Sequence, residues 1–390
     1  MNSRIEYLPT RRGFLRGTSA LSLSLILGER FTADAAEPMR LQRLQRSETP
    51  LTLETPLAAL DQPVTPNELF YVRNHFPTPA IQANAWRLRV VGAVERELEL
   101  SLEDLRRMTA RSVTMTLECA GNTRSVLTPV VRGVQWGNGA VSTTEWTGVS
   151  LIDVLNRAGL RAGAVDVVLE GADRGEIASE PRSPGVIHFA RSLPIAKARQ
   201  QSVLLAHRMG NADLPPNNGF PVRAIVPGWF GVASVKWLTR IVVTDRAYNG
   251  FFQSLDYSIF ERRQGLVTVT PLTEMQVKSV IVSPTPMQRI APNTAHRVHG
   301  AAWTGESNIT RVDVSADNGR TWTAARLLGD ERSHSWRMWE FPWRTPAQAG
   351  RVTLKARATD ARGNVQPLER DTDRRNYMIN HVLPVEVDVR

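Results

Sequence analysis

The amino-acid sequence predicts an α+β region followed by a β-sandwich of the immunoglobulin type. Over residues 66–275, short alternating apolar stretches are interrupted by short helical patterns that carry capping residues at their starts. Over residues 276–390, helical patterns become scarce, and period-two alternation with Asp-Asn-Gly and Arg-Gly-Asn turns replaces them. This change predicts two domains that meet near residue 275.

The first 35 residues are typical of an export signal. Arg11 and Arg12 precede a short apolar stretch, and the sequence ADA at 33–35 offers a small-residue cleavage site. The arginine pair indicates the twin-arginine route, which carries proteins already folded around a cofactor. The apolar stretch is shorter than the roughly 20 residues of a membrane-spanning helix. We therefore expect a signal peptide over residues 1–35, an N-terminal segment over residues 36–65, and a periplasmic protein without a membrane span.

The chain has 390 residues, one cysteine and a formal net charge of +10. One cysteine cannot form a disulfide within the chain, so a buried core must supply the stability. Without the signal, the length still exceeds the size at which single cores divide, which again predicts two domains. Lys and Arg are scattered without a basic block interleaved with aromatic residues, which argues against nucleic acid as a partner.

Two short helices are predicted before and after the segment that contains the cysteine. Ser101 and Ser150 are the expected N-caps, and each is followed three residues later by an aspartate that can complete a capping box. The second helix is expected to end at Gly159.

The cysteine itself is predicted to end a strand. In VTMTLEC, Val113, Met115, Leu117 and Cys119 alternate with other residues and so share one face. The sequence AGN then turns the chain. Side chains at strand ends, on the loops of a rigid sheet, are well placed for chemistry.

Three roles for Cys119 remain open from the residues alone. A catalytic nucleophile needs a histidine partner, for which His75, His188 and His207 are available. An inert buried thiol is the second reading, because free cysteine behaves as a small hydrophobe. The third is a soft thiolate ligand to a metal whose other ligands belong to a cofactor. Zinc or iron–sulfur sites would need more cysteines or a histidine pair, and a CxxCH haem motif is absent.

Five blocks of sequence carry a resemblance to a known family. They are YVRNHFPTP (71–79), ECAGNTRS (118–125), VQWGNGAVSTTEWTG (134–148), LLAHRMGNADLPPNNGFPVRAIVPGWFGVASVKWL (204–238) and the C-terminal sandwich. Together, and in this order, they resemble the sulfite oxidase family of molybdenum enzymes. The resemblance covers nearly all of the chain that follows the predicted signal.

The resemblance implies a molybdenum–molybdopterin cofactor, with Cys119 as the protein ligand of the metal and no haem. The cofactor contacts that it implies are Tyr71, Val72, Arg73, Asn74, His75, Cys119, Asp173, Asn218, Arg223, Ser234, Val235 and Lys236. Cationic side chains suit a phosphate-bearing pterin, because charge-assisted hydrogen bonds are strong. Asn218 stands where the family usually has histidine.

The resemblance also implies a catalytic set of Arg73, Cys119, Arg124, Trp136 and His207. Planar guanidinium groups fit an oxyanion well. His207, in LLAHRMGN, stands where the resemblance places the active-site tyrosine of the family, and an imidazole titrates near pH 6.5. We therefore expect a stronger pH dependence of turnover, unless this histidine is an ordinary hydrogen-bonded one. Near the C-terminus, Glu386 stands about where some members have a further pocket arginine.

The implied function is periplasmic oxidation of sulfite, or of a related reduced sulfur anion, to sulfate by oxo transfer, with a c-type cytochrome as electron acceptor. The sandwich is expected to mediate a homodimer, and a complex with a cytochrome subunit is an alternative. Three other functions stay open: a sulfur dehydrogenase-like molybdenum subunit of a sulfur-oxidation pathway, a sulfoxide reductase, and a non-catalytic exported binding protein with a decayed site. The sandwich argues against the sulfoxide reductase branch, which generally lacks it.

Overall fold

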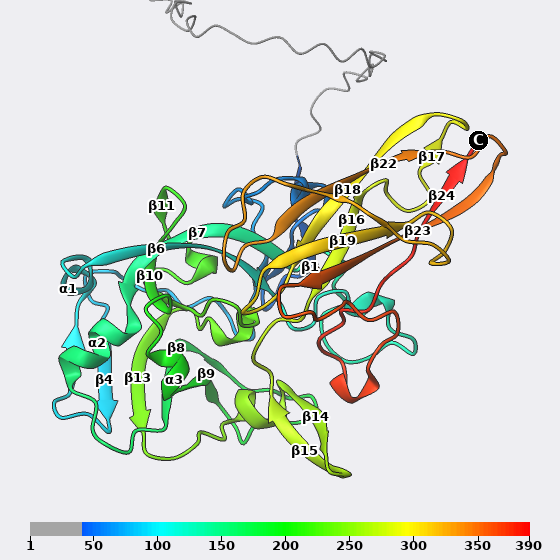
Figure 1. The fold of residues 1–390 in the computed structure, drawn as a ribbon. Helices are drawn as coiled ribbons and strands as arrows, with labels where there is room; N and C mark the ends of the chain where they lie inside the picture. The colour runs from blue at the N-terminus through cyan, green and yellow to red at the C-terminus, as the bar shows by residue number, and fades with distance from the viewer. Residues whose placement is uncertain (1–40) are drawn as a thin grey trace, which may run out of the picture. The chain divides into compact units, whose positions relative to one another are not determined.

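The computed structural model describes residues 41–390 (Figure 1). The predicted signal peptide and the first residues of the predicted N-terminal segment lie outside the described residues. Within the described part, no helix combines the length and the apolar character that a membrane crossing requires.

Strands dominate residues 41–275, and helices are few, so the expected alternation of strands and helices is wrong for most of this region. A three-stranded sheet has the order β1 (Leu44–Ser47), β2 (Thr52–Glu54), β3 (Val72–Arg73). A five-stranded sheet has the order β11 (Ala212–Asp213), β10 (Leu204–Met209), β7 (Val141–Ser150), β6 (Ala110–Glu118), with β12 (Arg223–Ile225) paired to β10. A second five-stranded sheet has the order β5 (Leu98–Leu100), β4 (Leu88–Gly92), β13 (Leu238–Thr244), β8 (Asp166–Gly175), β9 (Ile187–Pro194). Strands β14 (Ser258–Arg263) and β15 (Leu266–Pro271) form a separate hairpin.

The α-helices of the described chain are short: α1 (Leu102–Arg106), α2 (Leu151–Ala158) and α3 (Ile195–Ala198). The capping box of α1 is confirmed, because the Asp104 amide donates to the Ser101 hydroxyl and the Ser101 amide donates to the Asp104 carboxylate. Helix α2 starts and ends where expected, but its cap differs. The Ser150 hydroxyl donates to the carbonyl oxygen of Gln201 instead of capping the helix.

Two sheets make up the end of the chain, which we call the C-terminal sheet pair. The first has the order β16 (Lys278–Ser283), β18 (Ala295–Trp303), β22 (Arg337–Arg344), β21 (Arg326–Leu328). The second has the order β17 (Arg289–Ile290), β24 (Val385–Val389), β23 (Gly350–Asp360), β19 (Ile309–Ser315), β20 (Thr323–Ala324). Val298 and Trp339 of the first sheet pack in one core with Val312 and Leu354 of the second. Two packed sheets agree with the predicted change from mixed helices and strands to strands near residue 275, while the immunoglobulin-type topology stays a prediction.

Strand β6 positions the cysteine as its alternation predicts. Met115 and Leu117 lie in one apolar cluster with Cys119, and Val113 packs against this cluster. The strand ends at Glu118, so Cys119 is the first residue of the following turn. A late segment of the chain returns to this turn, because the Met378 amide donates to the carbonyl oxygen of Ala120 at 2.8 Å.

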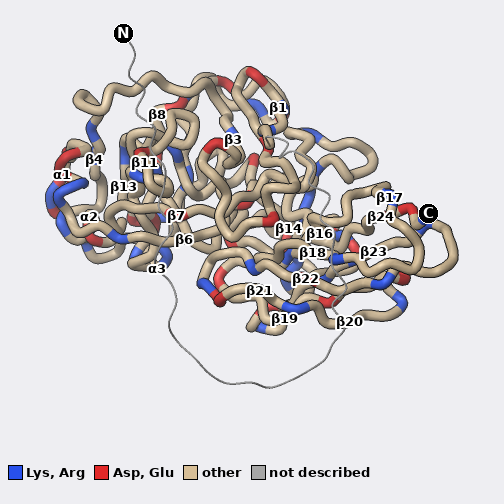
Figure 2. The backbone as a smooth tube through the Cα atoms, turned by 90° about the horizontal axis from the view of Figure 1, so that it is seen from above, with Lys and Arg blue, Asp and Glu red and all other residues tan. Residues whose placement is uncertain are grey.

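Charged residues are interspersed over the described chain. Segments of Lys and Arg and segments of Asp and Glu both occur in many regions of the backbone, as Figure 2 shows. This distribution matches the scattered basic residues of the sequence.

Candidate functional site

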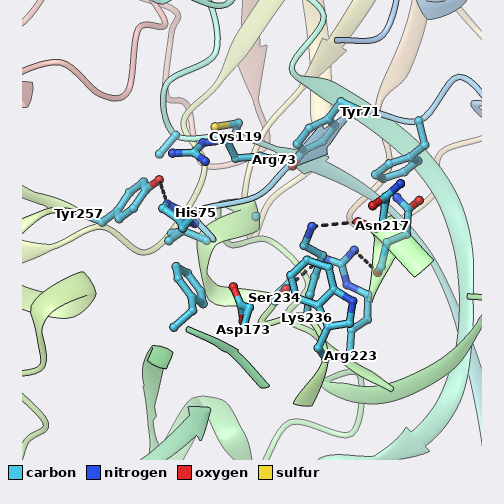
Figure 3. Close-up of a pocket in the computed structure, with 17 residues that line it drawn as sticks. Tyr71, Arg73, His75, Cys119, Asp173, Asn217, Arg223, Ser234, Lys236 and Tyr257 are labelled. Carbon is cyan, nitrogen blue, oxygen red and sulfur yellow. Dashed lines mark hydrogen bonds between the residues drawn. The ribbon is translucent and has the colours of Figure 1, made fainter. Parts of the chain in front are cut away.

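Two adjoining pockets share a wall that contains Cys119, and Figure 3 shows the residues that line the first of them. The residues that line both pockets are Arg73, His75, Cys119 and Tyr257. The remaining polar residues of the first pocket include Tyr71, Asp173, Asn217, Asn218, Arg223, Ser234 and Lys236. Those of the second pocket include Arg124, Arg132, Asp256, Asn376 and Tyr377. A group bound at the Cys119 sulfur can therefore face both pockets.

The turn after β6 fixes Cys119. Its amide donates to the carbonyl oxygen of Ala140 at 2.9 Å, and the Asn122 amide donates to the Cys119 carbonyl at 2.8 Å. Cys119 is 7% exposed. Two backbone bonds hold the thiol in place while it keeps access to the pockets.

One wall of the first pocket is cationic. The Arg223 guanidinium donates to the carbonyl oxygens of Asn218 and Ser234, both at 2.9 Å, and lies 4.8 Å from the ring centroid of Trp146. Lys236 donates to the carbonyl oxygen of Asn217 at 2.9 Å. Burial lowers the pKa of Arg223 to about 10 and lowers the pKa of Lys236 well below its usual value. Both groups favour an anionic ligand, which would relieve the cost of their burial.

Asp173, on β8, faces the same pocket with one buried oxygen that has no hydrogen-bond partner among the described residues. Burial raises the pKa of this carboxyl, and the positive charge of Lys236 opposes the change. Buried polar atoms are normally hydrogen-bonded. The open oxygen therefore indicates a ligand that brings polar hydrogens into the first pocket.

His75 and Tyr257 form the shared wall. The His75 Nε2 atom and the Tyr257 hydroxyl oxygen are 2.6 Å apart, and the imidazole stacks on Phe189 with ring centroids 4.6 Å apart. Burial, then the charges of Arg73 and Lys236, lower the pKa of His75 well below its usual value. Burial also raises the pKa of Tyr257. Both groups are therefore neutral near pH 7.

The second pocket holds Arg124 in a fixed position. Its Nε and one terminal nitrogen donate to the carbonyl oxygens of Asn376 and Val134, both at 3.0 Å. A Cβ atom at Gly121 would lie 2.2 Å from one guanidinium nitrogen, and a Cβ at Gly133 would lie 2.4 Å from another. Only glycine at these two positions leaves room for the guanidinium.

Arg132, Asp256 and Tyr377 form one cluster at the second pocket. The Arg132 guanidinium donates to Asp256 Oδ1 at 2.6 Å, and the Tyr377 hydroxyl donates to the same oxygen at 2.9 Å. The Arg124 guanidinium carbon lies 5.3 Å from the Tyr377 ring centroid. Three arginines, counting Arg73, thus line a pocket that contains one carboxylate, Asp256.

Comparison with known proteins gives a consistent result. Residues 75–252 match the family model of the oxidoreductase molybdopterin binding domain, and residues 269–389 match that of the Mo-co oxidoreductase dimerisation domain. Sulfite oxidase of Gallus gallus is 38% identical over 358 residues, which cover 85% of this chain and 75% of that protein. Sulfite oxidase of Arabidopsis thaliana is 31% identical, with 85% of this chain and 90% of that protein covered.

This chain belongs to the sulfite oxidase family. The mitochondrial sulfite oxidase of Homo sapiens is 36% identical, and the match spans 85% of this chain and 63% of that protein. Among solved structures, the sulfane dehydrogenase SoxCD from Paracoccus pantotrophus matches with a TM-score of 0.78 and 27% identity, over 93% of this chain and 96% of that chain. The chain is therefore an oxidoreductase that binds a molybdopterin cofactor.

The residues of the first pocket fit this cofactor. The open oxygen of Asp173 suits the N–H groups of a pterin, and Arg223 and Lys236 suit its phosphate. The Cys119 sulfur, at the end of the same pocket, is a soft ligand suited to a metal bound by dithiolene sulfur.

The structure brings together most, but not all, of the residues expected at a sulfite oxidase site. Tyr71, Arg73, His75, Cys119, Asp173, Asn218, Arg223, Ser234 and Lys236 line the first pocket, and Arg124 lines the second. Three others, Val72, Asn74 and Val235, are buried next to residues that line the first pocket, but they do not line it themselves. The Asn74 amide oxygen accepts a hydrogen bond from Lys236, so Asn74 acts through that lysine.

Trp136 and His207 do not line either pocket, which corrects the expectation for both. Trp136 is fully buried beside Tyr71, with ring centroids 6.4 Å apart. His207 occupies a bulge of β10, where the pairing with β7 shifts between Ala206 and Arg208. Its pKa is lowered, first by burial and then by the charge of Arg106.

Pocket residues that sequence reasoning missed include Arg132, Asp256, Tyr257 and Tyr377. Tyr71 and Tyr257 line the first pocket with Cys119, and Tyr257 and Tyr377 line the second, whereas His207, where the resemblance places the family tyrosine, lines neither. Glu386 is also misplaced as a pocket position, because it lies on β24 and contacts Arg351 at 3.3 Å. No local motif marks the missed residues, since their neighbours become close only in the fold.

Proposed function

We propose that this chain is a periplasmic sulfite-oxidising molybdenum enzyme that passes electrons to a c-type cytochrome. The observation that carries the proposal is the position of Cys119, on the wall between a pocket suited to the cofactor and a pocket lined by arginines. The likeness to sulfite oxidases over 85% of the chain supports the same substrate class.

Residues of the first pocket hold the cofactor in this proposal. Cys119 provides the thiolate, Asp173 accepts from the pterin, and Arg223 and Lys236 bind the phosphate. When bound, the molybdenum centre would give an oxygen atom to the substrate and accept two electrons from it.

The second pocket binds the anion. Arg73, Arg124 and Arg132 create a positive potential there, which concentrates small oxyanions and orients them by paired hydrogen bonds. Because Arg124 is already held by two backbone carbonyl oxygens, its position costs no reorganisation when the substrate arrives. The Tyr257 hydroxyl, which is neutral and held by His75 at 2.6 Å, is a fixed polar group at the wall shared by the two pockets.

A second candidate is oxidation of sulfane sulfur held on a carrier. The structural match with the sulfane dehydrogenase SoxCD favours it, and the same arginines suit a carrier-bound sulfur anion.

The location and the partners complete the proposal. The arginine pair Arg11 and Arg12 supports twin-arginine export to the periplasm. The match with the dimerisation domain model over residues 269–389 supports a homodimer. We retain the division into residues 36–65, 66–275 and 276–390, with catalysis in the second part and dimerisation in the third.

One experiment separates these readings. The protein is produced in a host that makes molybdopterin, and its molybdenum content is measured. Cytochrome c reduction is then assayed with sulfite and, separately, with a carrier-bound sulfane. A third assay measures oxidation of reduced viologen in the presence of a sulfoxide. We expect about one molybdenum per chain and sulfite-dependent reduction that Cys119→Ser abolishes. Metal-free protein from that host, or a Cys119→Ser variant with full activity, would contradict the proposal.

A further inference from the structure

The residue directly before Cys119 is a buried glutamate, Glu118, whose carboxylate takes no part in either pocket. Its side chain is 4% exposed. Within the turn itself, the Asn122 side-chain amide donates to Glu118 Oε1 at 3.0 Å. A buried carboxylate is costly unless it is paired and hydrogen-bonded, so the remaining contacts of Glu118 must be strong.

Those contacts come from the C-terminal sheet pair. Lys278 Nζ lies 3.0 Å from Glu118 Oε1, and Trp303 Nε1 donates to Glu118 Oε2 at 2.9 Å. Lys278 and Trp303 are directly opposite each other on the antiparallel strands β16 and β18. The ammonium also lies 5.7 Å from the indole ring centroid. Two donors on neighbouring strands thus hold the two oxygens of one carboxylate.

Lys278 also reaches the other side of the cysteine. Its ammonium donates to the Thr123 hydroxyl at 2.9 Å, and Thr123 has a left-handed backbone with φ of 73°. The Thr123 amide donates to the carbonyl oxygen of Gly137 at 2.7 Å. One ammonium therefore bridges residues 118 and 123, which bracket the turn that presents the thiol.

A second buried lysine offers a comparison within the same molecule. Lys197 also joins the two parts of the chain, through an ion pair with Glu306 and a bond to the carbonyl oxygen of Pro227 at 2.8 Å. Lys197 and Lys278 are both about 5% exposed or less. Of these two lysines, only Lys278 contacts the residues around Cys119. A comparison of variants at the two positions therefore distinguishes a general effect on structure from an effect on the site.

We propose that the Lys278–Glu118 ion pair, together with Trp303, is a positioning device through which the C-terminal sheet pair fixes Cys119 between the two pockets. Only the activity measurement in the test below rests on the proposed function; the inference about the position of Cys119 does not. It assigns to the C-terminal sheet pair a role in the site that is separate from dimerisation. Lys278, Glu118 and Trp303 are positioning residues, since they act through the cysteine and do not touch the pockets.

The test compares Lys278→Met with the matched control Lys197→Met in the metal-loaded, full-length protein. Hydrogen exchange of the Cys119, Asn122 and Thr123 amides is the main readout, because it reports local opening without reference to turnover. We expect roughly tenfold faster exchange at these amides in Lys278→Met and exchange within about twofold of wild type in Lys197→Met. We also expect kcat to fall, with little change in KM, and the paramagnetic spectrum of the partly reduced metal to broaden.

A double variant guards against a trivial loss of folding. Lys278→Met with Glu118→Gln removes both charges and leaves no unpaired buried carboxylate, so it should restore the melting temperature in part. The turn amides of this double variant should still exchange faster than in wild type, because the bridge to Thr123 is gone. The inference would be overturned if the amides of Cys119, Asn122 and Thr123 exchanged at the same rate in Lys278→Met as in Lys197→Met, or at the wild-type rate in Lys278→Met. Wild-type protein that loads no metal or oxidises no sulfur anion would instead overturn the proposed function, and the exchange result would stand apart from it.

Discussion

The Nε2 atom of His75 lies 2.6 Å from the hydroxyl oxygen of Tyr257, on the wall that the two pockets share. His75 follows β3, and Tyr257 directly precedes β14, so the pair joins segments that are 182 positions apart. Each side chain fixes the other, and both border the cysteine. Tyr257 thus supplies a hydroxyl at this wall, whereas His207, where the resemblance places the family tyrosine, lines neither pocket.

Removal of the Tyr257 hydroxyl should impair turnover without loss of the metal. We expect Tyr257→Phe to lower kcat/KM with sulfite roughly 10- to 100-fold, because one positioned donor in a buried site contributes this much. Steady-state cytochrome c reduction measures the effect, and molybdenum content equal to wild type is the control. Unchanged kcat/KM in a fully loaded variant would exclude a role for the hydroxyl.

His207 should be dispensable for the pH dependence of turnover. It lies in a bulge of β10 outside both pockets, and its pKa is already lowered by burial. We expect His207→Gln to keep kcat/KM within about twofold of wild type from about pH 6 to pH 9, because it touches no reacting group. A flattened profile in this variant would restore the role that the sequence suggests.

Gly121 should matter for substrate binding although it carries no side chain. A methyl group there would lie 2.2 Å from an Arg124 guanidinium nitrogen, so Gly121→Ala must displace that group. We expect KM for sulfite to rise roughly tenfold or more, as for Arg124→Lys, because the planar fork loses its alignment.

The control for this prediction is Gly163→Ala. Gly163 has φ of 87°, and a Cβ atom there would meet nothing within 4 Å, so the change strains the backbone without contacting Arg124. It should lower the melting temperature and leave KM unchanged. A rise of KM in both variants would point to a general loss of structure.

Burial of His75 should make stability depend on pH. Because the folded pKa of His75 is well below its unfolded value near 6.5, the unfolded chain binds more protons between the two values. The free energy of unfolding should therefore fall as pH drops below about 6.5, with a slope of up to about 1.4 kcal/mol per pH unit from this residue. His75→Gln should remove that part of the slope in chemical denaturation experiments at about pH 7.5, 6.5 and 5.5. Equal slopes for the two proteins would show that His75 binds its proton equally well in the folded and the unfolded chain, which would contradict the lowered pKa.

Much of the site could be predicted because its residues lie in short contiguous motifs. Alternation in β6 placed Cys119 at a strand end, and the blocks around Arg73 and Lys236 carried the cofactor contacts. Tyr257 and Tyr377 could not be found this way, since neither lies in a local pattern and both reach the pocket through long-range packing.

The fold shows the same division between local and long-range information. The helix cap at Ser101 follows from four residues and is confirmed. The expected alternation of strands and helices failed, because short apolar stretches do not distinguish a buried strand from a helix segment. His207 was assigned by the resemblance of its segment to the family, and the structure places it in a bulge of β10 that lines neither pocket.

The return of the Asn376–Met378 segment to the cysteine turn has a consequence for biosynthesis. Tyr377 lines the second pocket, the Asn376 carbonyl holds Arg124, and the Met378 amide bonds to Ala120. Arg124 and Asn376 are 252 positions apart, so the ribosome adds this segment long after the cysteine turn has emerged. A nascent chain that lacks it has an open second pocket and an unsupported arginine. The second pocket is therefore complete only after translation has passed Met378, long after the synthesis of the cysteine that borders it.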